Sequence, residues 1–71
     1  MALLNINLHQ DGEVSVRLLD QVGNCVYSRE YGKYDQGRHL IRLDVSDLPG
    51  GIYFCVIEVG GQQVTEKLVV L

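Results

Sequence analysis

Apolar and polar residues alternate along most of the chain, with the period of two that is typical of half-buried β-strands. The first clear example runs from Leu3 to Leu8, where Leu4, Ile6 and Leu8 alternate with polar residues. No segment has the spacing of three and four residues that an amphipathic helix requires. The predicted strands cover residues 3–8, 13–18, 24–31, 41–45, 52–59 and 62–71.

Turn-forming residues separate these runs. Asp11-Gly12 predicts a hairpin between the first two strands, and Gly60-Gly61 predicts a two-residue hairpin between the last two. Residues 20–23 predict another turn, and residues 32–37 a polar loop whose Tyr34 we expect to cover one end of the core. Short strands separated by such turns predict an all-β domain.

The fold class that fits best is a small Ig-like antiparallel β-sandwich of six or seven strands, formed by residues 1–71 as one domain. The run Ile52–Val59 is apolar on both faces and is therefore predicted to be a central strand. A chain of 71 residues buries only about 60% of its unfolded surface, so we expect modest stability.

Charge and motif content exclude several classes of function. The net charge is −3 without a basic cluster, which argues against a nucleic-acid partner. No apolar run approaches the roughly 20 residues of a membrane-spanning helix. His9 and His39 lack metal-ligand spacing, and no serine stands in a nucleophile turn. We therefore expect no catalytic residue, cofactor or metal, and expect Asp44 and Asp47 to cap a turn rather than to bind calcium.

The two cysteines, Cys25 and Cys55, both fall in predicted strands. They can form a disulfide between the two sheets, or they can remain two buried free thiols that behave as small apolar side chains. The sequence does not fix the distance between their Cα atoms, on which a disulfide depends.

The segment from Leu43 to Val59 organises the chain, because it holds a strand end, a Pro-Gly-Gly turn and the most apolar strand. Leu48, Gly51 and Tyr53 form the pattern Leu-x-x-Gly-x-Tyr, which resembles a tyrosine corner. In that motif the ring packs inside a β-sandwich and its hydroxyl binds backbone upstream. The same arrangement is predicted for Tyr53.

This corner is part of a longer resemblance. In order and spacing, the segments Val14–Gly23, Leu48–Phe54, Gly60-Gly61 and Lys67–Leu71 resemble the C-terminal sorting domain of the type IX (Por) secretion system. That family occurs at the C-terminus of secreted and surface proteins of Bacteroidetes-type bacteria. The chain departs from the family pattern in lacking an opening Asn-Pro element, and in having Leu71 where Lys or Arg is more typical.

The resemblance implies a non-catalytic sorting signal at the C-terminal end of a longer secreted precursor. Such a domain folds in the periplasm and is recognised by the outer-membrane type IX translocon. A sortase-like peptidase then removes it, and the passenger stays on the outer-membrane surface or becomes extracellular. The resemblance places the sorting signal in the corner and the final strand, at Leu48, Gly51, Tyr53, Lys67, Leu68, Val69, Val70 and Leu71.

An alternative function is a non-catalytic Ig-like or fibronectin-III-like accessory module of an adhesin or a carbohydrate-active enzyme. The corner around Leu48 and Tyr53 also resembles that of fibronectin-III domains, although those usually hold a buried Trp and this chain has none. Unpaired strand edges add one expectation about association. The uncharged strand over residues 3–8 and the last strand, residues 64–71, predict a homodimer at high concentration.

Overall fold

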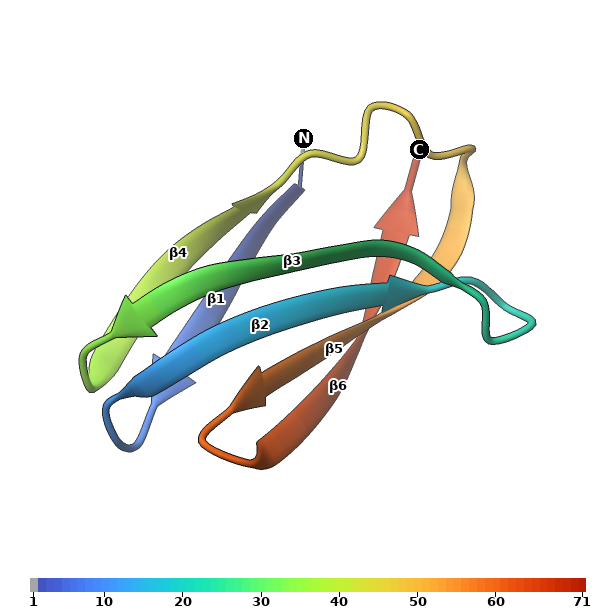
Figure 1. Cartoon of the computed structure of the whole chain (residues 1–71). Helices are drawn as coiled ribbons and strands as arrows, with labels where there is room; N and C mark the ends of the chain where they lie inside the picture. The colour runs from blue at the N-terminus through green and yellow to red at the C-terminus, as the bar shows by residue number, and fades with distance from the viewer. Residues whose placement is uncertain (1) are drawn as a thin grey trace.

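The computed structural model describes residues 2–71; residue 1, the first position of the predicted domain, lies outside them. Six strands and no helix make up the described part of the chain (Figure 1). They are β1 (Ala2–Leu8), β2 (Gly12–Leu19), β3 (Cys25–Tyr34), β4 (Gly37–Leu43), β5 (Gly51–Val59) and β6 (Gln62–Val70).

The strands form two antiparallel sheets of unequal width. β1 and β4 make a two-stranded sheet, and the other sheet has the order β3-β2-β5-β6. β5 lies between β2 and β6, which confirms the central position predicted for it. The predicted fold class, a small all-β sandwich, is confirmed.

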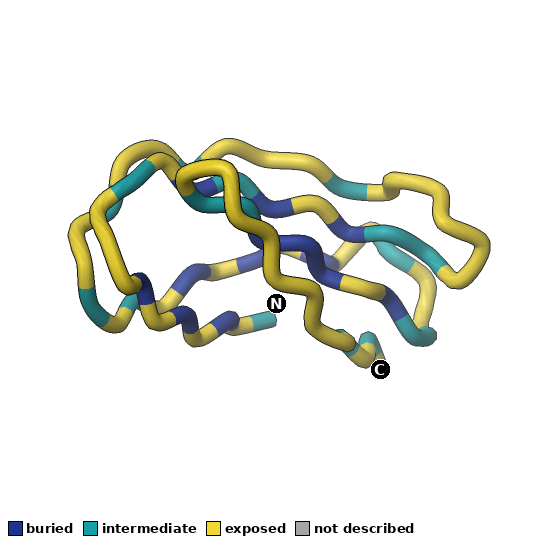
Figure 2. Tube along the Cα trace, turned by 90° about the horizontal axis from the view of Figure 1, so that it is seen from below, coloured by how far each residue is buried: buried dark blue, intermediate teal, exposed yellow. Residues whose placement is uncertain are grey.

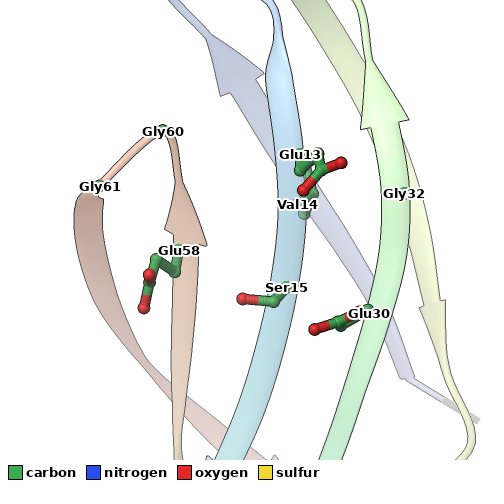
Figure 3. Close-up of a pocket in the computed structure, with 8 residues that line it drawn as sticks. All are labelled: Glu13, Val14, Ser15, Glu30, Gly32, Glu58, Gly60 and Gly61. Carbon is green, nitrogen blue, oxygen red and sulfur yellow. The ribbon is translucent and has the colours of Figure 1, made fainter.

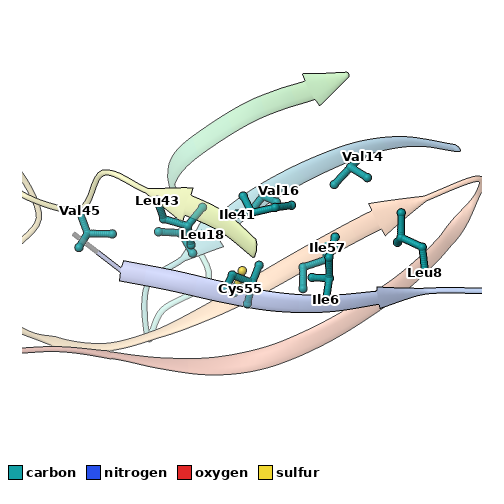
Figure 4. Packing of buried hydrophobic residues seen from close by; sticks show 11 residues of the cluster. Ile6, Leu8, Val14, Val16, Leu18, Ile41, Leu43, Val45, Cys55 and Ile57 are labelled. Atoms are coloured by element: carbon teal, nitrogen blue, oxygen red, sulfur yellow. The ribbon is translucent and has the colours of Figure 1, made fainter. Parts of the chain in front are cut away.

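One apolar core fills the space between the sheets (Figure 4). Alternate residues of each strand point into it, as the period of two predicts, and Val16, Leu18 and Leu43 have no exposed surface. Val45 is buried as well, but β4 ends at Leu43, two residues earlier than predicted. The main contributors are Leu4, Ile6 and Leu8 of β1, Val14, Val16 and Leu18 of β2, Ile41 and Leu43 of β4, and Cys55 and Ile57 of β5.

Tyrosines close the side of the sandwich where β3 lies over β4. The Tyr27 and Tyr31 hydroxyls are 2.7 Å apart, and the Tyr31 hydroxyl donates to the backbone oxygen of Arg42 on β4 at 3.0 Å. Tyr34 packs against the core and meets the His39 ring edge to face, with 4.9 Å between the ring centroids. Tyr34 therefore covers the core as expected, and the opposite side, between β1 and β6, has no such closure among the described residues.

Two of the predicted turns are wrong. Asp11-Gly12 does not form a hairpin, because β1 pairs with β4 while β2 pairs with β3 and β5, so the chain crosses between sheets at this point. A turn signal shows that the chain reverses, but not which strands then pair. Nor are residues 32–37 all loop: β3 continues to Tyr34, pairing with Gly12–Val14. Its residues are polar because β3 is an exposed edge strand.

The last hairpin is as predicted. Gly60 and Gly61 join β5 to β6 with φ values of 56° and 83°. Two successive positive φ values define the type I′ turn, whose twist matches that of the strands it connects. Residues with a Cβ adopt this conformation only at a cost, which explains the glycine pair.

The possible disulfide between the sheets is absent. Both cysteines are free, and both lie in the four-stranded sheet, where Cys25 is opposite Leu19 and Cys55 is opposite Leu18. Neighbouring residues of β2 face opposite sides of the sheet, so the two thiols do as well. Cys55 is buried and Cys25 is exposed, so the alternative of two buried free thiols holds only for Cys55.

This difference predicts unequal thiol reactivity. Burial, assisted by the charge of Glu66, raises the pKa of Cys55 to about 11, which keeps it protonated at neutral pH. The thiolate is the reactive form, so a disulfide reagent should modify Cys25 quickly and Cys55 only after denaturation. Reagent kinetics on Cys25→Ser and Cys55→Ser variants check this assignment. Equal rates for the two thiols in the folded protein would contradict it.

Candidate recognition surface at the corner and the C-terminal strand

Local hydrogen bonds fix the turn that leads into β5. The Leu48 N–H donates to the Val45 backbone oxygen at 3.0 Å. The Asp44 Oδ1 accepts from the Ser46 backbone N–H at 3.1 Å and from the Ser46 Oγ at 2.7 Å. These two bonds hold the pKa of Asp44 below its ordinary value. Asp44 therefore caps the turn, as expected.

Tyr53 forms the predicted tyrosine corner. Its side chain is only 6% exposed, and its hydroxyl donates to the Pro49 backbone oxygen at 2.6 Å. Gly51, between them, has a φ of 154°, which L side chains rarely adopt. The bond ties the turn to β5, so the corner is held by both a buried ring and a hydrogen bond.

β6 reaches this corner through its pairing with β5. Leu68 lies opposite Tyr53 and Val70 opposite Gly51, and both are half-buried against the core, as is Leu48. Leu48, Tyr53, Leu68 and Val70 thus form the inward-facing part of the predicted signal. Their packing explains them structurally, whatever contact they make with a partner.

The remaining residues of the predicted signal face outward. Lys67 lies opposite Phe54 and Val69 opposite Ile52, on the side of the sheet away from the core. Val69 is 56% exposed and Phe54 39%, while Leu71 lies beyond the end of β6. We call Ile52, Phe54, Lys67 and Val69 the outer-face patch. The structure therefore divides the predicted signal between two faces of the sheet.

Sequence reasoning missed two members of this patch, Ile52 and Phe54. The signal was available: β5 is apolar at nearly every position, but only one face of its sheet is covered by a second sheet. Exposure follows the same division, since β6 is exposed along most of its length while the strand at the N-terminus alternates between buried and exposed (Figure 2).

A second surface feature, at the other end of the four-stranded sheet, is acidic. Glu13, Glu30 and Glu58 line a hollow around Ser15, which lies opposite both Glu30 and Glu58 (Figure 3). Across residues 2–71 no three His, Cys, Asp or Glu side chains are placed to hold a metal ion together. The histidines have structural roles available: His39 Nε2 lies 2.6 Å from the Asp35 backbone oxygen.

Comparison with known families places these features. The family of secretion system C-terminal sorting domains matches residues 2–71. The chain belongs to this family. The match confirms the resemblance seen in the sequence and covers every strand of the sandwich, the corner and the C-terminal strand. No curated protein and no solved structure matches the sorting domain.

Membership establishes the general role of the domain. A sorting domain of this kind is a C-terminal signal for secretion across the outer membrane, to the cell surface or the extracellular space, and is generally not an enzyme. In the part of the chain that the structure describes, no helix is long and apolar enough to span a membrane.

Proposed function

We propose that this sorting domain is the C-terminal domain of a longer secreted precursor and directs the preceding passenger through the type IX outer-membrane translocon. In this proposal the domain folds in the periplasm and is recognised there. A sortase-like peptidase then removes it, and the passenger remains on the outer-membrane surface or is released. The domain is a substrate of this machinery and contributes no catalysis. The family match over residues 2–71 is the observation that carries the proposal.

We further propose that recognition uses the corner and the C-terminal strand in two different ways. The inward residues Leu48, Tyr53, Leu68 and Val70, with Gly51, fix the shape of this end of the sandwich. Lys67, Val69 and Leu71 are exposed and available for contact. The outer-face patch favours such a contact, because apolar side chains around a cation remain in solvent in the isolated domain.

A fusion tests the function directly. A reporter with an N-terminal signal peptide and this domain at its C-terminus should reach the surface of a bacterium that has type IX machinery. In a mutant lacking the translocon, the same fusion should accumulate in the periplasm. Cell fractionation and surface protease digestion measure the two pools.

A reporter with an established sorting domain serves as the positive control in the same strain. If that control is exported while this fusion stays in the periplasm, the proposed function is wrong. The fibronectin-III-like accessory module then becomes the better description of the domain.

A further inference from the structure

One side of the sandwich is open. The two-stranded sheet covers only part of the four-stranded one, so β1 has β4 on one side and no strand on the other. β6 lies beyond β1 on the opposite sheet, and its core-facing residues are poorly covered: Val64, opposite the buried Ile57, is 57% exposed. A free strand edge therefore lies above an uncovered strip of inward-facing side chains.

Two hollows mark this opening along its length. At the Leu8 end, a groove of about 410 Å³ is lined by residues of β1 together with Ile57, Val64 and Glu66. At the other end, a hollow of about 340 Å³ lies between Ala2 and the last residues of β6, Val69–Leu71. Strands in a sheet are about 4.8 Å apart, so the next place beside β1 is over β6.

The charges on the strand edges single out β1. Proteins protect free edges with charged side chains, because an unprotected edge pairs with other strands. The other three edge strands follow this rule: β3 carries Arg29 and Lys33, β4 carries Arg38 and Arg42, and β6 carries Glu66 and Lys67. β1 has no charged residue between Ala2 and Leu8. Its edge has the character of one that is covered in use.

The position of β6 limits what can cover it. A second copy joined edge to edge at β1 would bring its own four-stranded sheet against β6, which already extends beyond β1. A single strand has no second layer and meets no such obstacle. The homodimer expected from the sequence stays a prediction, and this geometry favours exchange of one strand over pairing of two intact β1 edges.

The side chains of the groove define the strand that fits. Ile6, Leu8, Ile57 and Val64 supply an apolar surface on alternate positions, and Glu66 supplies a negative charge. That charge is directed toward the core side, because it contributes to the raised pKa of Cys55 opposite. The complementary segment is an extended strand with alternate apolar residues and one Lys or Arg facing Glu66.

We propose that the polypeptide immediately preceding β1 in the precursor supplies this strand, pairs antiparallel with Ala2–Leu8 and covers Val64 on β6. A short hairpin before Ala2 would place it there, and the covalent connection gives it a high effective concentration that a free peptide lacks. This inference rests on the proposed function, because it requires a precursor that continues upstream. The sandwich is then completed by the segment that joins it to its passenger.

Amide hydrogen exchange tests the inference. The chain of residues 1–71 is compared with the same chain extended by about 15 preceding residues, which is enough for a second strand as long as β1 and a hairpin loop. In the extended protein, the outward amides of β1 should exchange roughly tenfold more slowly or less, because they become hydrogen-bonded. Proline substitutions within the added segment should restore fast exchange.

Two matched variants locate the added strand. Val64→Asp, in the groove, should reduce the new protection in the extended chain and change little in residues 1–71, where Val64 is 57% exposed. Val69→Asp, equally exposed at 56% but on the outer face, should leave protection unchanged in both proteins. Equal effects of the two variants would place the segment elsewhere and overturn the inference.

Other outcomes are equally decisive. Unchanged β1 exchange in the extended chain, or a precursor that begins at residue 1, overturns the inference. Protection that appears in residues 1–71 only as concentration rises, together with a dimer by light scattering, would assign the groove to a second copy instead. None of these readouts uses export, so a domain that is exported but leaves β1 unprotected refutes this inference and not the proposed function.

Discussion

Tyr53→Ala is expected to lower the free energy of unfolding by about 3–5 kcal/mol, the usual cost of truncating a buried aromatic side chain. Tyr53 is 6% exposed, and its removal leaves Leu48 and Leu68 without a packing partner at this end of the core. A domain of this size has only modest stability, so the variant should be largely unfolded. Urea denaturation followed by circular dichroism measures the change.

Tyr53→Phe is the matched control, because it keeps the ring and removes only the bond from the hydroxyl to the Pro49 oxygen. Its expected cost is about 0.5–1.5 kcal/mol, the net value of one hydrogen bond. An unchanged denaturation midpoint in Tyr53→Ala would show that the ring does not stabilise the corner.

The second large effect concerns export. In the reporter fusion, the double variant Lys67→Ala with Val69→Thr should lower surface delivery by roughly tenfold or more, as loss of about 1.4 kcal/mol of binding would. Both residues are exposed on the outer face, so the fold should stay within about ±0.5 kcal/mol of the parent. Surface protease digestion measures delivery, and urea denaturation of the purified domain measures stability.

A matched pair on the opposite edge strand separates a specific contact from a general effect. Lys33→Ala with Val26→Thr makes the same chemical changes on β3, where both residues are also exposed. Export should persist in this control. If both double variants are exported normally, the outer face of β6 is not the recognition surface; if export falls only in destabilised variants, the machinery reads the fold.

Much of the fold could be predicted because local patterns determine it. The period of two identifies the inward residues of β1 and β2, and the Gly60-Gly61 pair specifies its turn. Tyr53 was also predictable, since its spacing from Leu48 and Gly51 describes a corner whose hydrogen bond lies within a few residues of sequence.

What the sequence did not provide was the pairing of strands distant in the chain. Asp11-Gly12 has the composition of a hairpin, but the chain crosses between sheets there because β1 pairs with β4. The same limitation affected the cysteines, whose opposite orientations depend on the register of β3 and β5 against β2. It also concealed the outer-face patch, because the exposure of Phe54 depends on how many strands the second sheet contributes.

The two ends of the described chain emerge side by side, since Ala2 and Leu71 line the same hollow (Figure 1). A pulling force applied between a passenger attached before β1 and a machinery that holds the end of β6 would therefore act at one pole of the sandwich. It would load the Ala2–Leu43 pair first and then each next pair along β4, so that the strands unzip one pair at a time. Had the two ends lain at opposite poles, the same force would have strained all the pairs together in shear. The domain is thus built to open at low tension from the end that carries its passenger.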